Sequence, residues 1–497
     1  MKRRLGLIGS ALAALSLGAC AAGPDYVRPE TRVTAAGDFV DRGGTTVATP
    51  AAAADPRWWR LYDDPTLDRL VADALAYNTD VRAAVATLRQ ARAVLSEART
   101  ARLPTTDASA SYNRRRIGIA AVAGSLPTAA PGTGAGTPSH FDFDFFQAGF
   151  DAAYEVDLFG RVSRSVEAAR GDTEAAAADL DAARIAVAAE VARSYALACA
   201  NAAQADVARE TAALQDRTLD LTRRLLAGGR GTQREVDQAA VLAENARATV
   251  PSFEAERRAA LYALAALTGR PPAELDPTAA QCRQVPQIRV AIPVGDGATL
   301  LARRPDVRGA ERRLAAQTAR IGVATAALYP SISLAGSTTL GNQRFGDLAK
   351  SSSFGLSLGP LISWRFPNIS AARAQIRQAE AGTEAALARF DGTVLTALTE
   401  TEQALARYAG AIERIAALGR AEGAASNAAA ISRLRFDTGR DSFLQLLDAE
   451  RDRASARTAL AQAQQAVVES QVALFQALGG GWENAPPPAG TKPVRQP

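Results

Sequence analysis

The chain has 497 residues, and its 57 lysines and arginines nearly balance its 52 aspartates and glutamates. A net charge of only +5 gives no reason to expect a nucleic-acid-binding protein. The chain has one histidine, His140, and three cysteines, too few for histidine-rich zinc sites, HExxH chemistry or Ser-His-Asp catalysis. No GxxxxGKS/T or GxGxxG pattern stands between a strand pattern and a helix pattern. These features disfavour an enzyme.

The first residues read as an export signal that ends at a cysteine. A basic stretch, residues 2–4, precedes an apolar run, residues 5–17, and this run is shorter than the ~20 residues that a membrane-spanning helix needs. Residues 17–20 read Leu-Gly-Ala-Cys and resemble a bacterial lipobox, in which Cys20 would take a covalent lipid. Acylation with several chains would anchor the protein stably. The alternative is an ordinary secretory signal with a chance cysteine.

The other two cysteines lie far apart in the sequence. Cys199 falls in an alanine-rich helical stretch, and Cys282 falls in a loop-like stretch. This placement predicts no disulfide framework. After the signal, no stretch of 18 uninterrupted apolar residues occurs, so we expect no transmembrane helix in the rest of the chain.

The chain contains two copies of one unit. Residues 79–104 align without gaps to residues 305–330 at a constant separation of 226 positions, and residues 228–248 align to residues 438–458 at a separation of 210. Constant separations over such lengths indicate an internal repeat. Each copy reads as helix, strand, loop, strand, very long helix, glycine turn and long helix.

The repeat predicts the organisation of the whole chain. The expected segments are a signal peptide (1–19), a lipidated N-terminal linker (20–65), a first repeat (66–270), a Pro-rich linker (271–296), a second repeat (297–479) and a disordered tail (480–497). Each repeat would contain a β-hairpin, at 105–157 and 331–366, and a long helical hairpin, at 162–268 and 369–478. The tail is polar and Pro-rich, so it cannot bury enough apolar surface to fold alone.

Two stretches predict unusually long helices. Residues 162–227 and 369–437 are rich in Ala, Arg, Glu and Gln and contain almost no Pro. With a rise of 1.5 Å per residue, each would be a rod of about 100 Å. Such lengths are typical of a coiled coil or helical array rather than a globular core. The second rod carries a heptad seam at Leu387, Val394, Thr401, Tyr408 and Ile415, with a companion row at Asp391, Leu398, Leu405 and Ile412.

Four shorter stretches predict strands with one apolar and one polar face. The apolar positions are Ala108, Ala110 and Tyr112; Phe146, Ala148, Phe150, Ala152, Tyr154 and Val156; Ile332, Leu334 and Leu340; and Phe354, Leu356, Leu358, Ile362, Trp364 and Phe366. Segments of about ten residues with this alternation are typical of an outer-membrane barrel, lipid-facing on one side and lumen-facing on the other. The alternative is a half-buried sheet in a soluble protein.

Four strands are too few to close a barrel. An open sheet edge in lipid leaves backbone groups without hydrogen bonds, at a cost of several kcal/mol each. Other copies of the chain must therefore complete the sheet, and two copies would supply eight strands while three would supply twelve. Residues 114–139 and 341–351 are expected as loops on the cell exterior.

Five motifs carry a resemblance to a known family. They are GPDYVRP (23–29), WWRLYDDPTLDRLVADALAYNTDV (58–81), YEVDLFGRV (154–162), LLARRPDVRGAERRLAAQTARIGVATAALYPSISL (300–334) and TGRDSFLQLLDAERDR (438–453). Over residues 20–479 the chain resembles TolC-like outer-membrane efflux proteins, in particular the NodT-type lipoproteins that serve resistance-nodulation-division pumps. The resemblance implies an α+β membrane protein: a homotrimer with a 12-stranded barrel, four strands per chain, continued by a 12-helix periplasmic coiled-coil tunnel.

Residue by residue, the resemblance implies a closed periplasmic aperture at Glu235, Leu444, Asp448 and Arg451. Leu444 would pack around the axis. Asp448 and Arg451, three apart on one helix face, would form ionic latches to a neighbouring helix. Where some members carry a second acidic ring residue, this chain has Gln445. The alternative is an ordinary exposed ion pair worth under about 1 kcal/mol.

The resemblance also implies that the tips of the helical hairpins contact a periplasmic adaptor protein. Each tip has a glycine, which permits the left-handed turn that ends a helix, and a hydroxyl residue that can cap the next helix. The tip residues are Gly229, Arg230 and Thr232 in the first repeat and Gly439, Arg440 and Ser442 in the second. The alternative is that these residues form only the turns.

The function that the resemblance implies is that of an outer-membrane channel in a tripartite efflux pump. Partners would be an inner-membrane resistance-nodulation-division transporter, a periplasmic adaptor and outer-membrane lipid, with no metal and no cofactor beyond the lipid on Cys20. Drugs, metals and a lipid signal cannot be separated as cargo, because the outer tunnel selects little. Two rivals are a structural periplasmic coiled-coil lipoprotein without transport activity and a surface hydrolase, and the scarcity of histidine disfavours the hydrolase.

Overall fold

The computed structural model describes residues 21–30, 37–40, 48–49, 57–118, 140–288, 290–367 and 369–480. The expected signal peptide, the lipid acceptor Cys20 and the tail after Gly480 lie outside the described residues. The chain divides into two compact units, the first made of residues 1–27, 91–173 and 313–386 and the second of residues 28–90, 174–312 and 387–497. Each unit therefore combines segments of both sequence repeats.

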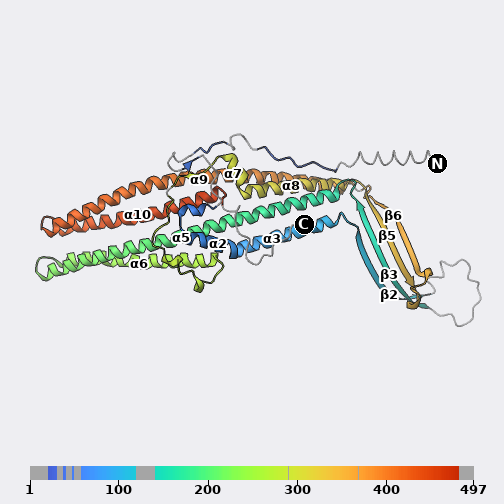
Figure 1. Cartoon of the computed structure of the whole chain (residues 1–497), viewed down its shortest axis with the longest axis horizontal. Helices are drawn as coiled ribbons and strands as arrows, with labels where there is room; N and C mark the ends of the chain where they lie inside the picture. Colours follow the sequence, from blue (N-terminus) through green and yellow to red (C-terminus); the bar gives the residue numbers. More distant parts are fainter. Residues whose placement is uncertain are drawn as a thin grey trace, which may run out of the picture. The chain divides into compact units, whose positions relative to one another are not determined.

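The first unit holds a four-stranded antiparallel sheet in the order β2-β3-β5-β6 (Figure 1). Its strands are β2 Thr105–Gly118, β3 His140–Val156, β5 Ser331–Asn342 and β6 Phe354–Ser363. Two short 3-10 helices, Phe345–Asp347 and Ser351–Ser353, lie between the last two strands. The pairing of β3 with β5 joins the two repeats and leaves β2 and β6 as the edges of the sheet.

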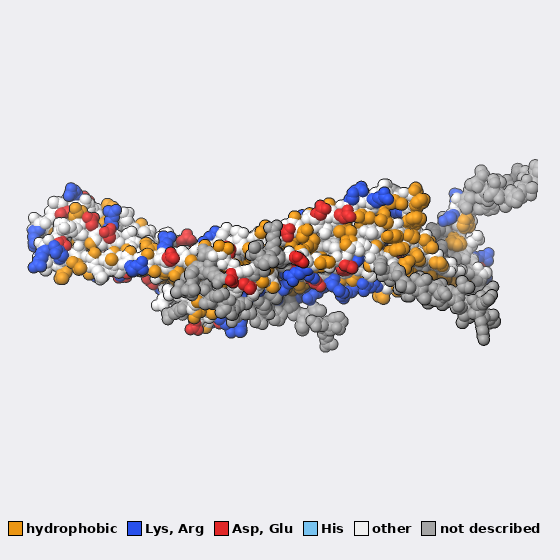
Figure 2. All heavy atoms as spheres, turned by 90° about the horizontal axis from the view of Figure 1, so that it is seen from above, with side chains coloured by type: hydrophobic (Ala, Val, Ile, Leu, Met, Phe, Trp, Pro, Cys, Tyr) orange, Lys and Arg blue, Asp and Glu red, His pale blue; other side chains and the backbone are white. Residues whose placement is uncertain are grey.

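The register places the predicted apolar positions on one face. Ala110, Ala148, Leu340 and Phe354 lie side by side across the four strands. Because side chains alternate along a strand, even-numbered residues of all four strands share this face. The next row, on the opposite face, consists of Ser109, Gly149, Thr339 and Gly355. Figure 2 shows hydrophobic side chains gathered where the sheet lies. The predicted alternation is confirmed except at Trp364 and Phe366, which follow the end of β6 at Ser363.

The predicted strand ends were wrong at the first hairpin. The segment beginning at Arg114 was expected as a loop, but β2 continues to Gly118, and β3 begins at His140, before the predicted start of the alternation at Phe146. Pairing of Arg116 with Asp142 belongs to this extension. This part of the strand was not recognised from the sequence, because a strand is predicted from alternating apolar residues and the charged residues here interrupt that alternation.

Helices form most of the rest of both units, and α5 and α9 are the longest of them (Figure 1). They are α2 Pro65–Tyr77, α3 Thr79–Thr100, α5 Arg161–Ala227, α6 Gln233–Leu267, α7 Gly297–Arg303, α8 Pro305–Ala326, α9 Ile369–Asp437 and α10 Phe443–Ala477. Three 3-10 helices, Trp58–Tyr62, Pro272–Glu274 and Ala279–Gln281, and a short parallel pair, β1 Ala48–Thr49 with β4 Ile292–Pro293, complete the elements. The two long-helix predictions are confirmed, since α5 has 67 residues and α9 has 69.

Among the described helices, none is both long enough and apolar enough to cross a membrane. The heptad seam of α9 is confirmed in its middle, where Thr401, Leu405 and Tyr408 are buried. It is wrong at its start, because Leu387 is 39% exposed and Asp391 is also exposed. An ionised aspartate is costly to bury without a partner, and the buried seam begins only after it.

The main core of the second unit is aromatic at its centre. Trp58 is fully buried and stacks on Phe475 of α10 with ring centroids 4.8 Å apart. Tyr62 donates a hydrogen bond to Gln471 Oε1 (3.2 Å), and Gln471 Nε2 donates one to the hydroxyl of Tyr408 (3.2 Å). Burial raises the pKa of Tyr62 far above its ordinary value. Trp59 is also buried. Both adjacent tryptophans therefore pack in the core.

A disulfide joins Cys199 of α5 to Cys282, 83 positions later, with a Cα–Cα distance of 5.1 Å. The expectation of no disulfide was therefore wrong. Cys199 faces the core with no exposed surface, and the segment between α6 and α7 returns along α5 so that Cys282 meets it. The bond ties this irregular segment to the longest helix of the first repeat.

Candidate functional site

Both helical hairpins of the second unit end in the same turn. Gly229 and Gly439 have φ of 70° and 71°, in the left-handed region. One residue further, the amide of Arg230 donates to the carbonyl of Leu225 and that of Arg440 to Arg435, each at 2.8 Å. These are the bonds of a Schellman helix end. The glycine turns inferred from the sequence are confirmed.

The helix that follows each turn begins with a capping box. The Oγ1 of Thr232 accepts from the amide of Glu235, and the carboxylate of Glu235 accepts from the amide of Thr232 at 2.7 Å. Ser442 and Gln445 repeat the arrangement at the start of α10. Gln445, the departure from the family pattern, thus has a definite role as a capping residue.

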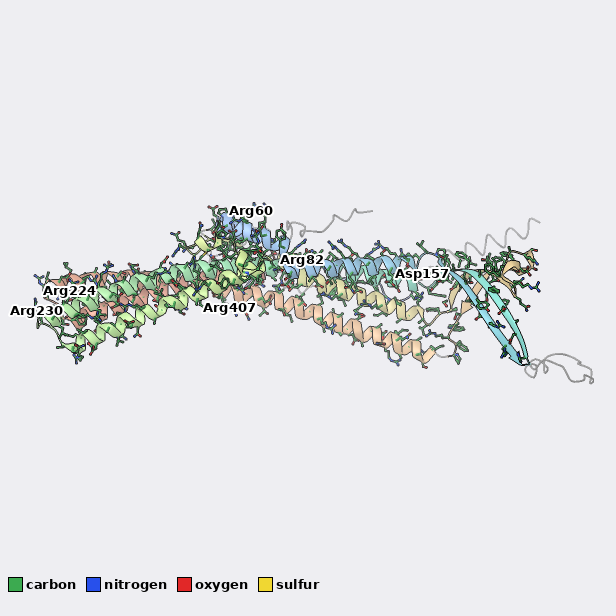
Figure 3. All side chains as sticks on the ribbon, turned by 90° about the horizontal axis from the view of Figure 1, so that it is seen from below. Arg60, Arg82, Asp157, Arg224, Arg230 and Arg407 are labelled. Carbon is green, nitrogen blue, oxygen red and sulfur yellow. A yellow bond between two sulfur atoms is a disulfide. The ribbon has the colours of Figure 1, made fainter. Side chains whose placement is uncertain are left out.

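The tip arginines project into solvent. Arg230 and Arg440 are both exposed, and within the described residues neither forms an ion pair. Figure 3 shows Arg230 at the end of the α5–α6 hairpin and Arg224 near it, in the last turn of α5. A nearby ion pair, Arg435 Nε to Asp441 Oδ1 at 2.7 Å, secures the second turn internally. The tips therefore present two unpaired guanidinium groups per chain.

Three of the four aperture residues share one face of α10. Leu444, Asp448 and Arg451 are spaced by four and three positions, which aligns them on a helix, and all three are exposed, Leu444 by 57%. In the part of the chain that the structure describes, neither Asp448 nor Arg451 has an ionic partner. Glu235 differs, because its carboxylate is held by the Thr232 cap on α6.

Sequence reasoning missed a buried acid next to the aperture residues. Glu450 of α10 is 1% exposed and forms ion pairs with Arg433 of α9 at 3.1 Å and with Arg453 at 2.9 Å. Leu446 and Leu447 lie on the same buried side of the helix. The sequence contained a signal for this buried acid. Glu450 follows Leu446 and Leu447 by four and three positions, which places its carboxylate on the same buried side of α10.

A second ionic group lies about two turns further along α10. Arg457 pairs with Glu422 of α9 at 3.2 Å and with Glu210 of α5 at 3.1 Å. The hydroxyl of Ser426 donates to Glu422 at 2.8 Å, and this bond, with Arg457, lowers the pKa of the Glu422 carboxyl. The start of α10 is thus fixed to α9 and α5 by charge pairs on the side away from the aperture residues.

The described residues contain no group of three or more His, Cys, Asp or Glu that could hold a metal ion.

In the first unit, the N-terminal segment docks at the junction between sheet and helix. The amide of Ala22 donates to the carbonyl of Phe159 at 3.0 Å, three residues after β3 ends. Asp25 pairs with the buried guanidinium of Arg164 at 2.6 Å. Asp157, seen in Figure 3 where β3 meets α5, caps α5 by accepting from the amides of residues 162 and 163.

Two glycines allow this close docking. A Cβ on Gly23, which has φ of 88°, would lie 2.5 Å from the Cα of Gly322 on α8. A Cβ on Gly322 would lie 2.7 Å from the carbonyl oxygen of Ala22 and 2.8 Å from the Cγ of Arg164. Neither position has room for a side chain. We call residues 21–25 the N-terminal strap.

An incomplete sheet with one apolar face, joined to long helical hairpins, defines a subunit of an outer-membrane channel. The chain matches the outer membrane efflux protein family over residues 70–270 and 298–480, and it belongs to that family. It is 31% identical over 483 residues to outer membrane protein OprJ of Pseudomonas aeruginosa, with 96% of each chain covered. It is 30% identical over 475 residues to solvent efflux pump outer membrane protein SrpC of Pseudomonas putida, covering 95% of this chain and 97% of that protein.

Solved channels share the fold. The outer-membrane channel OprN is similar with a TM-score of 0.83 and 35% identity, over 93% of this chain and all of that chain. The open-state MtrE channel of Neisseria gonorrhoeae is similar with a TM-score of 0.77 and 29% identity, over 93% of this chain and 99% of that chain. The protein is therefore an outer-membrane efflux channel, a trimer whose 12-stranded barrel continues as a helical tunnel into the periplasm. The TolC-like resemblance inferred from the motifs is confirmed.

Proposed function

We propose that three copies of the chain form a passive exit duct that receives small molecules from an inner-membrane transporter through a periplasmic adaptor protein. The observation that supports this most strongly is the even-numbered, mostly apolar face, which extends across four strands that cannot close alone. The two repeats, 66–270 and 297–479, each supply one β-hairpin and one helical hairpin to the duct. The duct carries out no catalysis, and the transporter supplies the energy.

The cargo is a drug or another toxic compound, and the transporter selects it. Similar proteins are named for different cargoes, including toluene for TtgI of Pseudomonas putida and pyoverdine for OpmQ of Pseudomonas aeruginosa. Relatives of one family that are named for unlike molecules indicate that the shared fold does not itself select one cargo. We therefore assign the choice of cargo to the partners of this chain.

The adaptor contacts the hairpin tips. The two turns of each chain have the same Schellman bonds and the same capping boxes, so a trimer offers six similar tips. The exposed guanidinium groups of Arg230 and Arg440 are available to acceptor groups of the adaptor. The residues assigned to this contact are Gly229, Arg230, Thr232, Gly439, Arg440 and Ser442.

The aperture closes where the α10 helices of three subunits approach one another. Leu444 supplies apolar contact, and Asp448 and Arg451 supply latches to a neighbouring helix; their exposure and lack of a partner within one chain support this role. Glu235 is assigned to the same aperture through the resemblance of the first repeat, although its carboxylate is engaged in the cap.

Replacing Asp448 and Arg451 together by alanine is expected to raise the conductance of purified trimers in planar bilayers severalfold, because the latches that hold the aperture closed are lost. The matched control is Glu190→Ala with Arg193→Ala, an exposed pair of the same spacing on α5, which should leave conductance unchanged. An unaltered conductance in the Asp448 and Arg451 variant would defeat the latch. A chain that yields only monomers without channel activity would defeat the duct itself and favour the structural lipoprotein.

Cys20 carries the covalent lipid. The acceptor lies outside the described residues, but the adjoining strap holds Ala22 at the carbonyl of Phe159, where β3 has just ended. This position brings the start of the mature chain to the periplasmic border of the barrel, so that acyl chains on Cys20 enter the inner leaflet of the outer membrane.

Gly322→Val is expected to displace the strap and to make trypsin cleave after Arg28 much faster, because the new side chain would overlap Ala22 and Arg164. Gly382→Val is the control, since that helical glycine has only Gln317 Oε1, at 3.8 Å, near its Cβ position. Labelling with palmitate should persist in both variants and disappear in Cys20→Ser. Equal cleavage of the two glycine variants would contradict docking of the strap.

A further inference from the structure

The first hairpin extends beyond the rest of the sheet. The pairing of β3 with β5 ends at Phe146 and Asn342, whereas the pairing of β2 with β3 continues to Gly118 and His140. Residues 113–118 and 140–145 therefore form a two-stranded ribbon that β5 does not flank. We call this ribbon the exit ribbon.

The outer face of the exit ribbon is charged. On the even-numbered, lipid-facing side, Tyr112 and Phe146 form the last aromatic pair, with ring centroids 4.9 Å apart. The next residues on this side are charged, and Arg116 Nε binds Asp142 Oδ1 at 2.7 Å. Charged side chains on the lipid face are confined to the ends of a barrel. The hydrocarbon layer therefore ends at Tyr112 and Phe146.

The length of the apolar band agrees with this border. From Val156 to Phe146 the strand takes ten steps, which span about 33 Å along the strand and about 25 Å along the membrane normal at a tilt of ~40°. An outer-membrane barrel has an apolar band about 25 Å tall. The exit ribbon consequently lies outside the hydrocarbon layer, at the external mouth.

The lumen face of the exit ribbon reverses the chemistry of the lumen below it. Below Phe146 the odd-numbered residues of β3 are Gln147, Gly149, Asp151, Ala153 and Glu155. On β3, the next two odd-numbered positions, which lie in the exit ribbon, hold Phe145 and Phe143 instead. The ring of Phe145 leans over β5, since a Cβ on Gly341 would lie 3.0 Å from its Cζ. Both phenyl groups are half-buried in the single chain.

A guanidinium group accompanies the two rings. Arg115 lies directly opposite Phe143 in the ladder, so their side chains share the lumen face with Cβ atoms about 5 Å apart. Arg114 and Arg116 are turned to the other face, where Asp142 pairs with both. Within the described residues Arg115 has no ionic partner. The lumen face thus combines apolar rings with an uncompensated positive charge.

We propose that Phe143, Phe145 and Arg115 of three subunits form a collar at the external mouth that binds aromatic anions. The proposal rests on the trimeric duct described above. Just below the exit ribbon, twelve strands about 4.8 Å apart, tilted by ~40°, enclose a backbone radius of about 12 Å. Phe143 and Phe145 lie on the lumen face directly above this opening. Six phenyl groups therefore narrow the mouth. Each subunit contributes one third of the collar, which no single chain can complete.

The collar has the chemistry for one class of solute. Phenyl groups bind flat aromatic rings by stacking or by edge contact, and a guanidinium group pairs with carboxylate or sulfonate oxygens. A solute that combines both groups can engage a ring and the charge of the same subunit. Small anions without a ring can use only Arg115.

The test measures block of single trimers in planar bilayers by 2-naphthalenesulfonate added on the side of the external mouth. Phe143→Ala with Phe145→Ala should raise the half-blocking concentration roughly tenfold, and Arg115→Gln should raise it by a similar factor. Methanesulfonate, which has no ring, should respond to Arg115→Gln but not to the phenylalanine variant. Phe150→Ala, on the lipid face of the same strand and 49% exposed, should leave the block by 2-naphthalenesulfonate unchanged.

Two results would overturn the collar. One is a naphthalenesulfonate block that is equal in the wild type and the phenylalanine variant, and the other is a block that occurs only from the periplasmic side. Failure of the duct itself would look different, because trimers would then carry no current before any blocker is added. Current with an unaltered block therefore rejects the collar alone.

Discussion

Replacing Cys199 and Cys282 together by alanine is expected to lower the free energy of unfolding by about 4.5 kcal/mol. The bond closes a loop of 83 residues, and the entropy that such a crosslink removes from the unfolded chain corresponds to a stabilisation of this size. The affected region is the second unit, which contains both cysteines. Helix melting of purified trimers, followed by circular dichroism, should begin at a clearly lower temperature in the variant.

Reduction provides the control for this prediction. A reducing agent should lower the melting temperature of the wild type toward that of the alanine variant, and it should not shift the variant further. The periplasm is an oxidising compartment in which such a bond persists. Identical melting of oxidised wild type, reduced wild type and variant would show that the bond does not stabilise the fold.

The sequence was sufficient to predict what depends on local periodicity. The even-numbered apolar positions of four strands recur with a period of two, and the register places them on one face as expected. The glycine turns at 229 and 439 were predicted from the repeat, which places a glycine at the same position in both copies. The structure gives these two glycines nearly the same φ. The lengths of α5 and α9 followed from the absence of helix breakers.

The features that depend on tertiary contact could not be predicted in this way. Nothing in the irregular segment between α6 and α7 indicates that its chain returns to α5, so the pairing of Cys282 with Cys199 was missed. The exit ribbon was missed for a related reason. Arg114, Arg116 and Asp142 resemble loop residues in sequence, but cross-strand ion pairs satisfy them in a strand.

Glu450 was missed because a seam is recognised by its apolar positions. Leu446 and Leu447 mark the buried side of α10, and an acid among them reads as an interruption of the pattern rather than as part of it. Only the structure supplies its partners, Arg433 from α9 and Arg453 from the next turn of α10. The acid thus fixes α10 against α9 at the level of the latch residues, since it lies between Asp448 and Arg451 in the sequence.

Glu450→Ala is expected to lower the free energy of unfolding by about 3 kcal/mol, because it leaves two arginines without their buried acid. The estimate lies at the lower end for such losses, since the side chains of Arg433 and Arg453 keep 37% and 21% of their exposure and can reach water. Urea unfolding of the variant and the wild type measures the difference. The control is Glu244→Ala, whose exposed i, i+3 pair with Arg247 should be worth less than about 1 kcal/mol.

A second variant separates lost charge pairing from lost packing. Glu450→Leu with Arg433→Leu removes the acid and its partner on α9 and fills the α9–α10 contact with apolar side chains, which is often neutral for a buried ion pair. Arg453 remains, and its partly exposed side chain can reach water. This double variant should recover most of the stability that Glu450→Ala loses. If the double variant is as unstable as Glu450→Ala, the loss of packing rather than the loss of the charge pair lowers the free energy of unfolding. If both variants match the wild type, the ion pair does not fix the start of α10, and the position of the latch residues must depend on contacts between subunits.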